Sequence, residues 1–243
     1  GSVAEDSPGN TYHVPLNPGS QKHFGNPKME GFTCCNGTAL ESSTKLQDTI
    51  YFRDVDNQAL VVNLYVPSTV TWAERHVVVQ QQTSFPYADT TRLVISDILR
   101  SGGAGDFDIK VRVPRWAKSG FFVKINGEEV GFEAPPVPGS YLTLSRDWKK
   151  NDTIELRIPF TFHLWPVMDQ PNIASIFYGP VLLAVEEPAP RTDWRSVHLN
   201  PQNLEQSITG NPSALRFQIG DVKLRPFFET YGRHSVYLDV SFD

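Results

Sequence analysis

The stretch from residue 58 to residue 98, "QALVVNLYVPSTVTWAERHVVVQQQTSFPYADTTRLVISDI", has the pattern that decides the fold. Short runs rich in β-branched and aromatic residues, such as LVVNLYV, HVVVQQQ and TRLVISDI, alternate with turn-forming residues. Runs of this length and composition are typical of β-strands. Because they recur at short, regular intervals, the stretch predicts a β-sandwich or a jelly roll.

The same pattern of short apolar runs and turn residues continues toward the C-terminus. Further runs of this kind are FDIKVRV, FFVKI, YLTLS, TIELRIPFTFHL, ASIFYGPVLLAVEE, LRFQIG, VKLRPFF and SVYLDVSF. Between two of them, Asn126-Gly127 predicts a tight two-residue hairpin. We therefore expect a mainly β fold, with a β-sandwich over residues 51–166 and a second, smaller β domain over residues 167–243.

Residues 1–50 have a different character. Residues 1–33 are rich in Gly, Pro and Asn and read as loop. Thr38 to Glu41 then reads as a capping box, which predicts a helix with Thr38 as its N-cap. Its apolar face would carry Ala39, Leu46 and Ile50. A single amphipathic helix cannot bury such a face alone, so we expect residues 1–50 to be the remnant of another domain, and the chain to be the C-terminal part of a longer protein.

Charge and hydropathy exclude two classes of partner. The 243 residues include 22 Lys and Arg against 27 Asp and Glu, a net charge of -5. A mildly acidic chain without a basic run has no general attraction for phosphate backbones, so we expect no nucleic acid. The sequence has no apolar stretch long enough for a membrane span, so we expect no membrane partner.

The two cysteines, Cys34 and Cys35, are neighbours in the sequence. A disulfide between adjacent residues would be strained, because their Cα atoms lie closer than disulfide geometry allows. They are either two small buried apolar side chains or thiols at a helix N-terminus, where a thiolate is stabilised. Such a thiolate could be a nucleophile or a zinc ligand. A zinc site would need further ligands, for which His13, His23, Glu30 and Glu41 are candidates.

The sequence resembles a known enzyme family in several segments. They are FTCCNGTALESSTKLQDTIYF with LVVNLYVPSTVTW after it, then VRVPRWA, VKINGEEV, PGSYLTLSRDWKKNDTIELRIPF and ASIFYGPVLLA, and upstream YHVPLNPGS. They are similar to the β-L-arabinofuranosidase-like enzymes of glycoside hydrolase family 127 and the related family 146. The resemblance covers most of the chain.

The resemblance implies an (α/α)6 toroid followed by β-sandwich domains, and retaining hydrolysis of β-L-arabinofuranosides. It implies that Cys34 is the nucleophile, that Cys34 and Cys35 bind zinc, and that Tyr12 contacts the sugar of an L-arabinose-containing glycan. His13 either contacts the sugar as well or is a surface histidine. Glu41 could face zinc or substrate, although its role in the capping box already explains it and is the favoured interpretation.

Only the last loop and helix of the toroid match this sequence, so the missing toroid would be a partner of these domains. In the family, the other zinc ligands and the acid/base lie on earlier toroid helices. We therefore expect zinc in the full-length protein, and we expect the isolated chain to be inactive and to lack a complete zinc site. Two other functions stay open: a carbohydrate-binding module that stacks sugars on exposed aromatic residues, and an interaction module that self-associates as a homo-oligomer through a bare apolar face.

Overall fold

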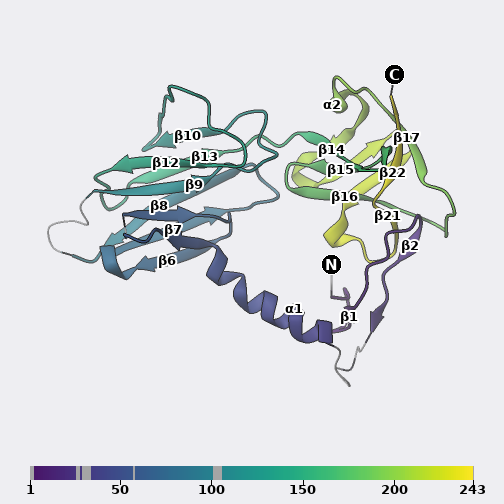
Figure 1. The fold of residues 1–243 in the computed structure, drawn as a ribbon, viewed down its shortest axis with the longest axis horizontal. Helices are drawn as coiled ribbons and strands as arrows, with labels where there is room; N and C mark the ends of the chain where they lie inside the picture. Colours follow the sequence, from purple (N-terminus) through teal and green to yellow (C-terminus); the bar gives the residue numbers. More distant parts are fainter. Residues whose placement is uncertain (1–2, 26–27, 29–33, 57, 101–105, 243) are drawn as a thin grey trace. The chain divides into compact units, whose positions relative to one another are not determined.

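The computed structural model describes residues 3–25, 28, 34–56, 58–100 and 106–242, with residues 34–36, 39 and 40 described as backbone only. The predicted mainly β fold is confirmed: most of the regular structure consists of strands arranged in sheets (Figure 1). The chain divides into two compact units. One comprises residues 43–160, and the other combines residues 1–42 with residues 161–243. No helix in the described ranges is long and apolar enough to cross a membrane.

The unit of residues 43–160 is a sandwich of two sheets. The six-stranded sheet has the order β11-β10-β13-β8-β7-β6. Its strands are β6 (Ser68–Trp72), β7 (Val77–Thr83), β8 (Thr90–Ile98), β10 (Phe122–Ile125), β11 (Glu128–Glu129) and β13 (Thr153–Arg157). The four-stranded sheet has the order β12-β9-β5-β4, and its strands are β4 (Tyr51–Arg53), β5 (Ala59–Val62), β9 (Phe107–Arg112) and β12 (Tyr141–Arg146).

A single apolar core joins the two sheets. Alternate residues of each strand point inward, as the two-residue period of a strand requires. The six-stranded sheet contributes Val79, Leu93, Val123, Ile154 and Leu156, and the four-stranded sheet contributes Leu60, Val62, Ile109, Val111 and Leu144. Trp148 is completely buried in this core, and its indole Nε1 donates a hydrogen bond of 3.0 Å to the carbonyl oxygen of Phe107. The expected Asn126-Gly127 hairpin connects β10 and β11, with positive φ at both residues.

The other unit contains one large sheet with its own apolar core. The main order of its strands is β17-β22-β15-β16-β20-β19-β18, with β14 on β15 and β21 on β16 and β2. The bounds are β14 (Phe162–Val167), β15 (Gln170–Tyr178), β16 (Val181–Glu186), β17 (Arg195–Leu199), β18 (Thr209–Asn211), β19 (Arg216–Ile219), β20 (Val222–Pro226), β21 (Arg233–Ser235) and β22 (Leu238–Phe242). A short helix, α2 (Leu204–Ser207), follows β17.

Three short strands come from the beginning of the chain. They are β1 (Asn10–Thr11), which pairs with β3 (Phe24–Gly25), and β2 (Ser20–Gln21), which pairs with β21. We call residues 10–25 the N-terminal segment. The predicted domain division put residues 1–50 apart from the second β domain. The contacts instead group residues 1–42 with residues 161–243.

The predicted helix is present, but its start was predicted wrongly. Helix α1 runs over Cys34–Lys45, so it begins five residues before Ala39, where a helix capped by Thr38 would begin. Thr38 therefore lies inside the helix, and Glu41 lies in its middle instead of its first turn. Asn36 and Gly37 both favour turns, but such preferences are weak and do not stop a helix that has begun before them. Of the predicted apolar face, Leu46 is 59% exposed, whereas Ile50 is buried.

Candidate functional site

The corrected start of α1 changes where the two cysteines lie. Cys34 and Cys35 occupy the first turn of the helix and not a loop before it. The first turn of a helix has backbone N–H groups without intrahelical partners and the positive end of the helix dipole, and both favour a thiolate. The side chains of Cys34 and Cys35 lie outside the described part of the structure, so their predicted roles stay predictions.

Tyr12 and His13 lie together in the N-terminal segment. Their rings meet edge to face with centroids 4.3 Å apart, and the Thr11 hydroxyl donates a hydrogen bond of 2.7 Å to the carbonyl oxygen of His13. Both side chains are exposed. They could therefore present a phenol and an imidazole to a ligand from one short stretch of backbone. Glu41, the remaining candidate, is exposed on α1.

Lys22 fixes the end of the N-terminal segment. Its side chain is almost fully buried, and its ammonium donates hydrogen bonds of 3.1 Å to the carbonyl oxygen of Phe227 and 2.6 Å to that of Thr230. The same ammonium lies 4.3 Å from the centroid of the Phe227 ring, which adds a cation–π contact. Burial lowers the pKa of Lys22 from its ordinary value.

His234 and Gly19 hold the middle of the segment. His234 is completely buried, and its two ring nitrogens each lie 3.1 Å from a carbonyl oxygen, that of Gly232 and that of Pro15. Both ring nitrogens of His234 therefore face carbonyl oxygens, which only accept hydrogen bonds. Gly19 has φ +62°, and a Cβ there would lie 2.6 Å from the backbone nitrogen of Arg191. Only glycine fits this close approach without strain.

A buried carboxylate completes this anchor. Glu187 accepts hydrogen bonds from Arg195 Nε (3.0 Å) and Nη2 (2.6 Å), and from the Ser235 hydroxyl (2.7 Å). Ser235 in turn accepts a bond of 3.1 Å from the backbone N–H of Gly19. Burial alone would raise the pKa of Glu187, but the bonds from Arg195 and Ser235 and the nearby positive charges outweigh it and lower this pKa.

Sequence reasoning missed this anchor cluster, which we define as Lys22, Glu187, Arg195, His234 and Ser235. Its members come from segments far apart in the chain, and no periodicity marks a lysine in a Gly/Pro-rich loop as buried. The one usable signal was Gly19, because glycine often marks close backbone approach. The cluster holds the segment that carries Tyr12 and His13.

Among the side chains that the structure describes, no group of three or more His, Cys, Asp or Glu lies close enough together to hold a metal ion. The predicted thiolate ligands Cys34 and Cys35 lie outside that set. As donors, two adjacent cysteines suit zinc, but they supply only half of a tetrahedral site.

Comparisons with known proteins give a consistent result. Residues 59–160 match the family described as β-L-arabinofuranosidase, GH127 middle domain. Among solved structures, the chain is similar to a glycoside hydrolase, with a TM-score of 0.74 and 16% identity over 99% of this chain and 46% of that one. It is also similar to Ara127N, a GH127 β-L-arabinofuranosidase from Geobacillus stearothermophilus T6, with a TM-score of 0.65 and 19% identity over 86% and 37% of the two chains.

A third similar structure is a GH127 β-arabinofuranosidase, with a TM-score of 0.70 and 20% identity over 99% of this chain and 43% of that one. The chain thus spans less than half of the length of each of these structures. Curated proteins give no significant match. At these identities, the structural likeness establishes the fold that the chain shares with these enzymes.

Proposed function

We propose that the chain belongs to glycoside hydrolase family 127 and is the C-terminal part of a retaining β-L-arabinofuranosidase-like enzyme, because residues 59–160 match the GH127 middle domain and the fold is shared with GH127 structures. The observation that carries the proposal is the order of two features along the chain. An adjacent cysteine pair lies in the first turn of α1, and a GH127 middle domain begins soon after this helix.

In this proposal, Cys34 is the nucleophile. Its thiolate attacks the anomeric carbon while an acid protonates the departing oxygen, so the C–S bond forms as the glycosidic C–O bond breaks. Water then cleaves the glycosyl-thioether, and the same acid group, now a base, takes its proton. The first turn of α1 favours the anionic sulfur that this attack requires. The acid/base residue would come from the toroid.

Cys34 and Cys35 would be two ligands of a zinc ion, and the other ligands would also come from the toroid. When bound, zinc would lower the pKa of the thiols and fix their positions. Tyr12 and His13 would contact the sugar, and the anchor cluster would hold their segment in place. Glu41 lies on the same helix as the two cysteines and would support the zinc site without binding the metal. The glycan substrate would contain L-arabinose.

The experiment is substitution of Cys34 in the full-length protein. We expect Cys34→Ala to abolish hydrolysis of an aryl β-L-arabinofuranoside, and Ser42→Ala, an exposed position on the same helix, to leave it unchanged. Mass spectrometry of the wild-type protein during turnover should detect a glycosyl adduct on the peptide that contains Cys34. Retained hydrolysis in a folded Cys34→Ala protein would end the nucleophile proposal.

A second measurement addresses the part played by the toroid. We propose that residues 1–243 alone are inactive, since their two cysteines cannot complete the family's zinc site. Elemental analysis of the purified, reduced chain should find less than one zinc per chain, and both thiols should react with a thiol reagent. One tightly bound zinc per chain, together with hydrolytic activity, would contradict this.

A further inference from the structure

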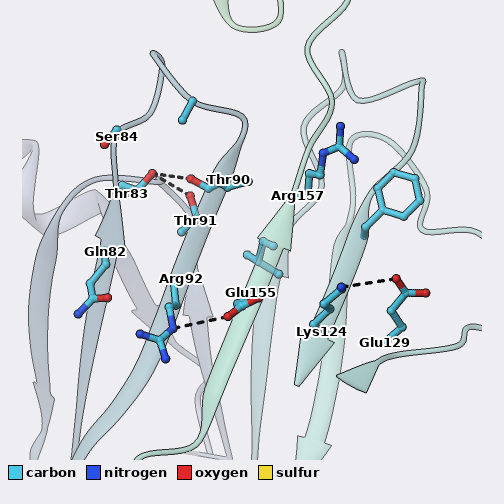
Figure 2. Close-up of a pocket in the computed structure, with 13 residues that line it drawn as sticks. Gln82, Thr83, Ser84, Thr90, Thr91, Arg92, Lys124, Glu129, Glu155 and Arg157 are labelled. Carbon is cyan, nitrogen blue, oxygen red and sulfur yellow. Dashed lines mark hydrogen bonds and ion pairs between the residues drawn. The ribbon is translucent and has the colours of Figure 1, made fainter. Parts of the chain in front are cut away.

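A groove of about 780 Å³ crosses the outer face of the six-stranded sheet in the sandwich unit. Five side chains lie in register across it, one from each of five neighbouring strands: Gln82 on β7, Arg92 on β8, Glu155 on β13, Lys124 on β10 and Glu129 on β11. Figure 2 shows them side by side across the strands. Neighbouring strands are about 4.8 Å apart, so the row is roughly 19 Å long. We call it the polar row.

The charges of the polar row alternate in sign. Arg92 Nε lies 3.7 Å from Glu155 Oε1, and Lys124 Nζ lies 3.7 Å from Glu129 Oε1. All four side chains are at least 46% exposed. Exposed pairs of this kind contribute little to stability. The row therefore has no net charge and presents hydrogen-bond donors and acceptors in alternation. Its residues can be substituted without unfolding the sandwich.

An aromatic ring borders the polar row. Phe122, which lies opposite Arg157 in the next register position, is 53% exposed. A Cβ on Gly120 would lie 2.8 Å from the Phe122 ring, so one side of this ring lies close to the glycine. An exposed aromatic ring beside a row of polar groups offers a flat apolar face on which a ligand ring can stack.

At its β7–β8 end, the same border of the polar row is made of small polar groups. Ser84 and Ala88, from the turn between β7 and β8, line the groove with Thr83, Thr90 and Thr91. The Thr83 hydroxyl bonds to the carbonyl oxygen of Thr90 at 3.1 Å and to the Thr91 hydroxyl at 3.0 Å (Figure 2). The volume of the groove lies in the range of ligand-binding sites.

From these features we propose that the groove binds a strand of an uncharged polysaccharide. Sugar hydroxyls both donate and accept, so one chain can satisfy the guanidinium, carboxylate and ammonium groups in turn. The C–H face of one sugar ring would stack on Phe122. A charged polymer would meet attraction and repulsion in alternation along the row. Single-stranded nucleic acid in particular needs a positive groove with stacking rings, and the alternation argues against it.

This site is separate from the proposed cysteine chemistry. It uses residues of the sandwich only, and it would hold a glycan without cleaving it. Its test can therefore succeed or fail independently of the proposed function. In particular, Cys34→Ala should leave binding to the groove unchanged.

The experiment is affinity electrophoresis of the whole chain through gels that contain neutral arabinan, neutral xylan or anionic polygalacturonate. We expect retardation by at least one neutral polysaccharide, with little change between low and high salt. Phe122→Ala should weaken it about tenfold, a loss of ~1.4 kcal/mol. The matched control is Phe52→Ala, because Phe52 is a phenylalanine of similar exposure (45%) on β4 of the other sheet.

A second variant protects the test against a folding artefact. The double change Arg92→Gln with Glu155→Gln keeps both side chains polar and removes one ion pair, and it should also weaken retardation while the circular dichroism spectrum stays the same. The proposal is overturned by three results: no retardation by either neutral polysaccharide, equal retardation of the Phe122→Ala protein, or salt-sensitive retardation by polygalacturonate alone.

Discussion

The sandwich core and the N-terminal segment are held in place by opposite kinds of interaction. The sandwich joins its two sheets through apolar side chains, whose stabilisation is proportional to buried area and has no strict direction. The N-terminal segment is fixed by the anchor cluster, in which a lysine, a histidine and a carboxylate each need particular partners. Apolar packing tolerates small shifts, whereas a buried polar group that loses its partner retains the whole cost of its desolvation. The two regions should therefore respond differently to mutation and to pH.

The largest expected effect is on the stability of the apolar sandwich core. Trp148→Ala should lower the free energy of unfolding of the sandwich by about 3–5 kcal/mol, because it leaves a cavity in a fully buried site and removes the bond to the Phe107 carbonyl. Urea unfolding followed by circular dichroism would measure it. Trp165→Ala is the control: that side chain is 68% exposed, and its loss should cost less than about 0.5 kcal/mol. Similar costs for the two variants would show that the core does not carry the stability.

The next effect concerns the anchor cluster. Lys22→Met should destabilise the attachment of the N-terminal segment by about 1–3 kcal/mol, because the carbonyl groups of Phe227 and Thr230 lose their donor while staying buried. Hydrogen exchange followed by mass spectrometry should show faster exchange in the peptide that contains Ser20 and Gln21, which form β2.

Lys28→Met, at an exposed position, is the control for that measurement. It should leave exchange in β2 unchanged. The sandwich peptides should exchange at the same rate in both variants. Unaltered exchange of β2 in Lys22→Met would mean that strand pairing with β21 alone holds the segment.

The same contrast explains how far the sequence could predict the molecule. The strands of the sandwich follow a two-residue period with turn residues between them, so their existence and the mainly β class could be predicted locally. The start of α1 could not, because Thr38 and Glu41 form a capping box in sequence while the helix begins at Cys34. Capping preferences are worth about 1 kcal/mol and yield to the surrounding structure.

The candidate sites divide in the same way. Cys34 and Cys35 could be singled out because adjacent cysteines are unusual, and Tyr12 because of a family resemblance. The anchor cluster and the polar row could not, since both depend on which segments become neighbours. Arg92, Glu155 and Lys124 are simply the outward residues of three alternating strands until the sheet order places them side by side. Strand order is a non-local property, and one sequence carries no direct signal for it.

The smallest expected effect is the pH dependence that the anchor cluster contributes. The pKa of Glu187 in the folded protein lies below its ordinary value of 4.5. Its carboxylate therefore contributes stability that is complete above this ordinary pKa and is lost as pH falls through the folded-state pKa. We expect the stability of the unit of residues 1–42 and 161–243 to decrease as pH is lowered from about 5 toward 3.

In Glu187→Gln the slope of the unfolding free energy against pH should be smaller, because the group that titrates is gone. The difference should correspond to at most one proton per molecule. Each protein is compared with its own stability at neutral pH, so that the lost charge of Glu187 beside Arg195 does not enter the comparison. Glu205→Gln, at an exposed site on α2, should keep the wild-type slope. The sandwich is followed separately, because a backbone hydrogen bond from Ala59 lowers the pKa of Asp54 and a hydrogen bond from Lys150 lowers the pKa of Asp97, which gives this unit an acid dependence of its own. An unchanged slope in Glu187→Gln would mean that other carboxyl groups set the acid sensitivity, and that the anchor depends on Lys22 and His234 more than on its buried ion pair.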